Sequence, residues 1–174
     1  QTAPALMDKM TGEDFMAIFK KAVEQIKKSQ PGLSSIQVIG FCFGGRLAYL
    51  AGLEQSVKKI VSFYGAKSAM ADYYDGTSAA GALCDERGGD NSLKVLAFYG
   101  KNDASIPEDD RAVIKKLFEE ANIGYLAYEY PAGHAYFQKG RPNYDAESAA
   151  LSKQQLRSEE HTSELQSHSF ISYA

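Results

Sequence analysis

The sequence lacks three features that would point to particular classes of protein. It has two cysteines, it carries no block of like charges, and no apolar stretch is long enough to cross a bilayer. Two cysteines are too few for a disulfide framework and suit a reducing compartment, so we expect a cytoplasmic protein. The 19 basic and 22 acidic residues are dispersed and leave a net charge of −3. This balance favours a small-molecule ligand over nucleic acid or a membrane surface.

A signal peptide is also missing, but the chain begins with Gln1 rather than an initiator methionine. The native N-terminus is therefore expected to lie upstream of Gln1, and the sequence does not exclude a targeting segment there. The sequence does not indicate an oligomeric state.

The pattern of apolar residues predicts a parallel α/β sheet. A length of 174 residues with 44% hydrophobic residues fits one globular domain. Four apolar runs have the composition of strands buried on both faces: IQVIGF, KIVSFYG, LKVLAFYG and YLAYEYP. An amphipathic helix with Thr11 and Asp14 as a capping pair precedes the first run, and EDDRAVIKKLFEEANIG forms a helix between the last two. We interpret the glycine-rich stretch from Ala66 to Ser92 as a long excursion rather than a second domain.

The last part of the chain, RSEEHTSELQSHSFISYA, has no apolar periodicity. It resembles the forward translation of a common sequencing-library adapter, with Arg157 to Ser167 and Ile171 to Ala174 matching its codons. The alternative is a disordered polar tail. We therefore expect residues 1–156 to form a partial α/β domain and residues 157–174 to be a non-native tail, which we exclude from the fold and site predictions. His134 is then the only histidine available for function.

The segment GFCFGG follows the first predicted strand and leads into a predicted helix. Gly40 and Gly44 lie two positions on either side of Cys42, which is the spacing of a nucleophile elbow with cysteine in the central position. Such a turn exposes the sulfur, and the start of the next helix favours the reactive thiolate. The backbone N–H of Phe43 would then face a developing oxyanion.

Two other interpretations of this turn compete with catalysis. A buried cysteine is usually a small apolar residue, and a glycine-rich turn between strand and helix often binds phosphate. A dinucleotide fingerprint, however, would need glycine at position 42, and no acidic residue ends the next predicted strand.

A nucleophilic cysteine needs a base and a group that orients the base. In YGKNDASIP, Asp103 follows the third predicted strand, and in PAGHAYF, His134 follows the fourth. The carboxyl ends of parallel strands share one edge of the sheet, so both residues are expected near Cys42. Taken singly, Asp103 could shape a turn and His134 could be an ordinary exposed histidine. We interpret Cys84 as structural or incidental.

Together these motifs resemble the dienelactone hydrolases (carboxymethylenebutenolidases) of the α/β-hydrolase superfamily. The resemblance rests on GFCFGG, YGKND, AGHAYF and RPNYDAESAAL, and covers about Gly12 to Leu156. It implies a three-layer αβα hydrolase fold, truncated here at both ends. It also implies that Cys42 is the nucleophile, with His134 as base and acid and Asp103 as the group that orients it. Family members open enol-lactones, such as dienelactone to maleylacetate, through a thioester and without a metal or cofactor.

The chain also departs from this family. The opening strands, a glutamate beside the thiol, an arginine for the substrate carboxylate and the second oxyanion donor would all precede it. Gln138 stands where some members have an arginine, so Lys139 and Arg141 are candidate replacements. Without a neighbouring strand, residues 36–41 would have one unpaired edge. We expect a fragment with little or no activity.

Two other functions stay open at this point. One is a carboxylesterase of broad specificity with the same fold. The other is a non-catalytic α/β module whose glycine-rich turn binds a phosphorylated ligand.

Overall fold

The computed structural model describes residues 9–161 and 169–173. The helices are α2 (Gly12–Ser29), α3 (Phe43–Ala51), α4 (Ala79–Arg87), α5 (Glu108–Glu120) and α6 (Ala146–His161). The strands are β1 (Ile36–Phe41), β2 (Val57–Phe63), β3 (Lys94–Gly100), β4 (Gly124–Tyr130) and β5 (Ser169–Tyr173). The four predicted apolar runs thus form β1 to β4.

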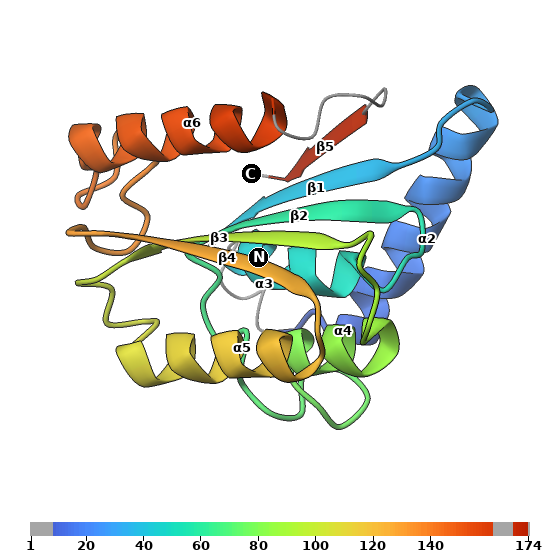
Figure 1. The fold of residues 1–174 in the computed structure, drawn as a ribbon, viewed down its shortest axis with the longest axis horizontal. Helices are drawn as coiled ribbons and strands as arrows, with labels where there is room; N and C mark the ends of the chain where they lie inside the picture. The colour runs from blue at the N-terminus through green and yellow to red at the C-terminus, as the bar shows by residue number, and fades with distance from the viewer. Residues whose placement is uncertain (1–8, 162–168, 174) are drawn as a thin grey trace.

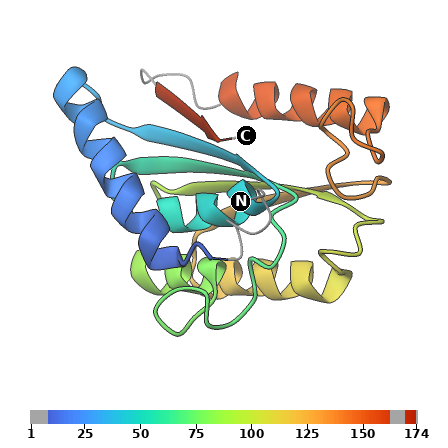
Figure 2. The same ribbon diagram turned by 180° about the vertical axis from the view of Figure 1, so that it is seen from behind.

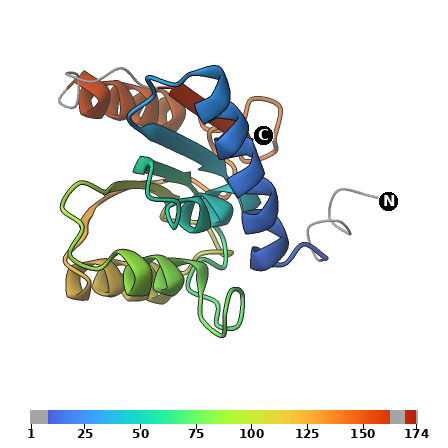
Figure 3. The same cartoon turned by 90° about the vertical axis from the view of Figure 1, so that its right-hand side faces the viewer.

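The strands form one parallel sheet in the order β4-β3-β2-β1-β5. Helices α3, α4 and α5 cover one face and α6 covers the other (Figures 1 and 2). Figure 3 shows the sheet between these two layers, with α2 running along one side. The α/β fold class predicted from the alternation of strands and helices is confirmed.

Burial on both faces explains the apolar runs Ile60–Val61 in β2 and Val95–Phe98 in β3. One core cluster lies between the sheet and helices α2 to α5, and includes Phe19, Leu50 and Phe118. The second lies on the face covered by α6, where the rings of Phe63 and Phe98 stack with centroids 4.5 Å apart. The edge strand β4 is much more exposed than β2 and β3.

Both predicted helices are present, as α2 and α5, but the stretch predicted as a long excursion also contains a helix. The capping pair is present, because the Asp14 backbone N–H donates to Thr11 Oγ1 and the Thr11 N–H donates to Asp14 Oδ2. The stretch 66–92, in contrast, is not all irregular, since α4 lies within it. The Ser78 hydroxyl caps α4 by accepting from the Gly81 N–H at 3.0 Å. Most of the buried residues of α4 are small, such as Ala79, Ala80, Gly81 and Ala82, and give no strong periodic signal.

Regular structure continues past the expected boundary at residue 156. Helix α6 continues to His161, and β5 pairs in parallel with β1 from Ile36 to Gly40. The edge of β1 that we expected to be unpaired is therefore occupied. Glu159 joins α6 to the sheet, because its backbone oxygen accepts from Lys59 Nζ at 3.1 Å and its carboxylate accepts from the Tyr128 hydroxyl at 2.8 Å. The adapter origin of residues 157–174 stays a prediction, and residues 162–168 and 174 lie outside the described residues.

Within the described part of the chain, no helix is both long and apolar enough to span a membrane.

Candidate active site

Cys42 lies at the sharp turn between β1 and α3. It has φ 54° and ψ −116°, a backbone conformation that is unfavourable for a residue with a side chain. The surrounding backbone holds it there, since its N–H donates to the Phe63 carbonyl at 2.9 Å and its own carbonyl accepts from the Gly45 N–H at 3.0 Å. The predicted strand, turn and helix are therefore present at GFCFGG.

The glycines of the turn are needed because β1, β2 and α3 approach each other closely. A Cβ atom at Gly40 would lie 1.9 Å from the Gly44 carbonyl oxygen, and one at Gly45 would lie 2.8 Å from the Phe63 carbonyl oxygen. The Ser62 hydroxyl on β2 donates to the Gly45 carbonyl at 3.0 Å and ties the helix start to the sheet. Any larger residue at Gly40 would push the first turn of α3 away from the strand.

The structure brings Asp103 and His134 to Cys42. Asp103 follows β3 and His134 follows β4, so both lie at the carboxyl edge of the sheet. His134 Nδ1 is 2.6 Å from Asp103 Oδ2, and His134 Nε2 is 3.1 Å from Cys42 Sγ. One imidazole thus bridges a carboxylate and a thiol, in the order predicted from the sequence.

Further hydrogen bonds and packing contacts fix the positions of Asp103 and His134. Asp103 is 2% exposed, and its second oxygen, Oδ1, accepts from the Ser105 N–H at 2.8 Å. The backbone of His134 is fixed by Asn143, whose amide donates to the His134 carbonyl at 3.2 Å. The Tyr64 ring packs edge-on against the imidazole with ring centroids 5.3 Å apart.

This arrangement shifts the pKa values of His134 and Cys42 in opposite directions. Hydrogen bonds to Asp103 and then to Cys42 raise the pKa of His134 to about 9, although partial burial opposes the shift. The hydrogen bond from His134 lowers the pKa of the Cys42 thiol, again against the effect of burial. Both shifts move the pair toward a thiolate beside an imidazolium.

The start of α3 adds to the stabilisation of negative charge on the sulfur. The Phe43 backbone N–H also lowers the pKa of Cys42, so this donor lies beside the sulfur where an oxyanion donor was predicted. The second cysteine, Cys84, differs from Cys42 in its surroundings and its pKa. It is buried on α4, and burial raises its pKa to about 12.

The two candidate replacements for the arginine of the family lie at the surface. Lys139 and Arg141 are exposed, and Arg141 Nε donates to the Gln138 side chain at 3.2 Å. Arg46, which is not among the residues predicted from the sequence, is buried one helical turn after Cys42. The spacing of four residues in CFGGR would have placed both at the start of one helix.

No metal ligand set is apparent: among the described residues, no three His, Cys, Asp or Glu side chains are grouped so that they could hold an ion.

Known proteins resemble this chain in sequence. The sequence profile of the dienelactone hydrolase family matches residues 1–158. A Synechocystis protein described as "Putative carboxymethylenebutenolidase" is 30% identical over 140 residues, which cover 80% of this chain and 53% of that protein. The carboxymethylenebutenolidase of Pseudomonas sp. strain P51 is 27% identical over 113 residues, which cover 65% of this chain and 42% of that enzyme. The chain thus spans about half or less of the length of these relatives.

Solved structures resemble it in fold. The crystal structure of a Klebsiella pneumoniae protein described as "Putative Dienelactone Hydrolase" superposes with a TM-score of 0.76 at 23% identity, covering 91% of this chain and 66% of that one. Thermogutta terrifontis esterase 2, phosphorylated by paraoxon, gives a TM-score of 0.63 at 17% identity, covering 89% of this chain and 65% of that one. At these identities the likeness concerns the fold alone. The family profile matches most of the length of the chain, and the fold and the site geometry agree with that match. The chain therefore belongs to the dienelactone hydrolase family.

Proposed function

We propose that Cys42, His134 and Asp103 form the catalytic triad of a hydrolase that opens enol-lactones or related activated esters. The observation that carries the proposal is the position of His134, which lies 3.1 Å from the Cys42 sulfur and 2.6 Å from the Asp103 carboxylate. Nucleophile, base and orienting group are the three parts that covalent ester hydrolysis needs. Dienelactone, which would give maleylacetate, is the type of substrate we expect.

The reaction proceeds in two balanced steps. The Cys42 thiolate attacks the lactone carbonyl, and the Phe43 N–H donates to the oxyanion. The carbon–oxygen bond of the ring then breaks, and the leaving enolate takes a proton from the His134 imidazolium, which leaves a thioester. Next, neutral His134 removes a proton from water, the hydroxide attacks the thioester, and the thiolate leaves beside a restored imidazolium.

For this chain taken by itself we further propose slow turnover. Among the residues that the structure describes, the Phe43 N–H is the one oxyanion donor that we identify beside the sulfur. Loss of one donor from an oxyanion hole costs about 10²- to 10³-fold in kcat. We therefore expect acylation of Cys42 to be measurable in a single turnover, while multiple turnover is slow. Rapid steady-state hydrolysis would contradict this part of the proposal.

Alkylation and substrate choice test the triad itself. Iodoacetamide should label Cys42 much faster than free cysteine at neutral pH and should abolish acylation. An enol-lactone should acylate Cys42, whereas the ethyl ester of the same acid should not. Labelling at the rate of free cysteine would refute the triad and favour a non-catalytic binding module. Equal acylation by the lactone and the ethyl ester would indicate a broad carboxylesterase.

A further inference from the structure

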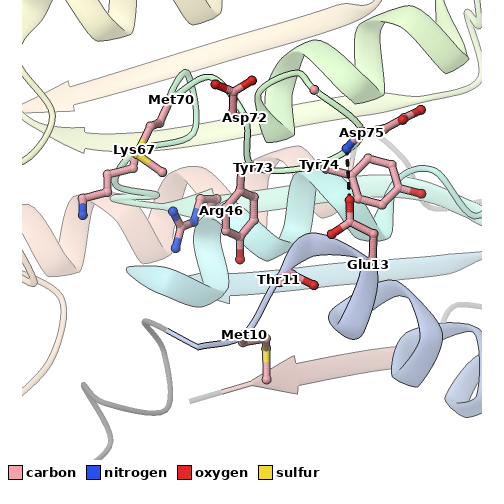
Figure 4. A pocket seen from close by; sticks show the side chains of 11 residues that line it. Met10, Thr11, Glu13, Arg46, Lys67, Met70, Asp72, Tyr73, Tyr74 and Asp75 are labelled. Atoms are coloured by element: carbon pink, nitrogen blue, oxygen red, sulfur yellow. Dashed lines mark hydrogen bonds between the residues drawn. The ribbon is translucent and has the colours of Figure 1, made fainter.

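Three arginines are buried in the described part of the chain, and each has a different set of contacts: Arg46, Arg87 and Arg111. Arg46 lines the cavity drawn in Figure 4, where its guanidinium stacks on the Tyr73 ring at 3.9 Å from the centroid. Arg87 donates to backbone carbonyls beside the start of β2, at the edge of the sheet opposite the candidate active site. Arg111, on α5, donates to the two segments of the chain that lead to Asp103 and His134.

The Arg111 guanidinium joins the loop after β3 to strand β4. Its Nη1 donates to the Ile106 carbonyl at 2.7 Å, and its Nε donates to the Glu129 carboxylate at 3.1 Å. Arg111 is 7% exposed, so both bonds form largely out of water, where bonds from a charged donor are strong. Neither bond belongs to the backbone hydrogen bonds of α5, so the side chain is not needed to form the helix itself.

The Ile106 end of this link leads directly to Asp103. The Ile106 N–H donates to the Asp103 carbonyl at 3.1 Å, and the Ser105 N–H donates to Asp103 Oδ1 at 2.8 Å. Residues 103–106 therefore form one hydrogen-bonded turn, which we call the Asp103 turn. Arg111 binds this turn at its last carbonyl.

The Glu129 end of the link leads to His134. Glu129 is the penultimate residue of β4, the strand that precedes His134. The Asn102 N–H donates to the Ala132 carbonyl at 3.0 Å, so the segments that follow β3 and β4 also contact each other directly. Arg111 adds a charged link between the Asp103 turn and the strand that leads to the imidazole.

The bond that these two segments must align is the short one between His134 Nδ1 and Asp103 Oδ2, at 2.6 Å. A hydrogen bond weakens steeply as its distance and angle depart from the optimum. We propose that Arg111 is a positioning residue that sets the bond between Asp103 and His134 by fixing the Asp103 turn relative to β4. This inference rests on the proposed function, in which Asp103 orients His134.

The charge of Arg111 and its positioning role have opposite effects on His134, which makes the role testable. A nearby cation lowers the pKa of an imidazole, so loss of the charge by itself would raise the pKa of His134. Loss of the aligned carboxylate would lower it, because the hydrogen bond to Asp103 is the largest cause of the raised pKa, followed by that to Cys42. An ion pair that served only stability would leave the pKa unchanged in the folded protein.

NMR titration of the His134 ring carbons measures this pKa. A Cys42→Ala background isolates the contact between His134 and Asp103 from the sulfur. In that background Arg111→Gln should lower the pKa of His134 by about 1, and an unchanged or higher pKa in the folded variant would overturn the inference. Lys115→Gln is the matched control, because it removes an exposed ion pair from the same helix, and it should leave the pKa unchanged.

Two further comparisons separate positioning from a general loss of stability. Asp90→Asn removes the ion pair with Arg87, so it should lower the free energy of unfolding without moving the pKa of His134. A fall as large as that in Arg111→Gln would attribute the effect to stability and contradict the proposal. In an Asp103→Asn background, Arg111→Gln should cause no further fall, because the group through which it acts is already changed. A further fall would mean that Arg111 does not act through Asp103.

The outcome is decisive even if Arg111→Gln does not fold. Arg111→Lys keeps the charge but replaces the planar fork of donors by one ammonium, so it should also lower the pKa of His134. A wild-type pKa in this variant would overturn the positioning role. The proposed function is tested separately by iodoacetamide labelling of Cys42 in the wild-type chain. Labelling at the rate of free cysteine would refute the triad, whereas titration in the Cys42→Ala background would still decide the role of Arg111.

Discussion

Replacing Asp103 by asparagine tests whether the carboxylate sets the charge state of the site. The substitution keeps the size of the side chain but removes the negative charge that lies 2.6 Å from His134 Nδ1. The hydrogen bond to Asp103 is the largest contribution to the raised pKa of His134. The asparagine amide would present either an acceptor without charge or a donor, and a donor would favour the imidazole tautomer with its proton on Nε2, facing the sulfur.

The magnitude follows from the pKa of His134. The increase from 6.5 to about 9 corresponds to roughly 3 kcal/mol in favour of the imidazolium. At about pH 7.5 the protonated fraction is then about 0.97, whereas a histidine with its ordinary pKa would be about 0.1 protonated. Because the hydrogen bond from His134 is the main reason that the pKa of Cys42 is lowered, the thiolate population should fall in parallel. We expect Asp103→Asn to slow alkylation about tenfold at this pH.

The assay is the rate of iodoacetamide labelling between about pH 5 and pH 10, read by mass spectrometry of the Cys42 peptide. A Cys84→Ala background removes the second thiol. The wild-type rate should reach its plateau at a lower pH than the rate of free cysteine, and the variant should require a higher pH to reach the same rate. Asp109→Asn, at the start of α5, is the matched control. A profile for Asp103→Asn that superposes on the wild type would refute the reasoning, because it would mean that the carboxylate does not hold the imidazolium.

Two substitutions away from the triad test the fold that supports it. Gly40→Ala should destabilise the chain by several kcal/mol and abolish rapid Cys42 labelling, because the new Cβ would lie 1.9 Å from a backbone oxygen of α3. Gly32→Ala is its control, since no atom lies within 4 Å of that Cβ, and urea unfolding should show little change. Asp90→Asn should cost roughly 1–2 kcal/mol at neutral pH, because the carboxylate accepts from Ser92 and pairs with the buried Arg87. These contacts lower the pKa of Asp90 in the folded state, so its contribution is present above the ordinary value of 3.8 and is lost as the pH falls below it. Urea unfolding at neutral and acidic pH should therefore give a wild-type to variant difference that shrinks in acid, and a difference that stays constant would contradict this explanation.

Much of the fold could be predicted because strands buried on both faces are continuous apolar runs. The run IQVIGF corresponds residue for residue to β1, and the other three runs overlap β2, β3 and β4 closely. The candidate site followed from the same pattern. Once the strands are parallel, residues that follow their carboxyl ends must meet at one edge, so Cys42, Asp103 and His134 could be placed together before any distance was known.

The missed features have physical reasons. Helix α4 buries small residues such as Ala79 and Ala80, whose weak apolar signal resembles that of a loop. Strand β5 pairs with β1 through backbone hydrogen bonds, which do not require particular side chains. Its pairing therefore could not be predicted from a pattern of apolar residues. Arg46 was overlooked because the motif that contains it was interpreted only as a turn around Cys42.

A resting thiolate beside an imidazolium would also determine which esters the proposed triad can hydrolyse. Attack on the carbonyl then needs no proton transfer, because the Cys42 sulfur already carries its negative charge. The tetrahedral intermediate, however, expels the weaker base, and the lowered pKa of Cys42 makes the sulfur leave in preference to a simple alkoxide. An enolate is a weaker base than an alkoxide, and the imidazolium of His134 lies where it can supply a proton as the enolate leaves. The lowered pKa of the Cys42 thiol thus favours activated esters over simple alkyl esters as substrates of the proposed triad.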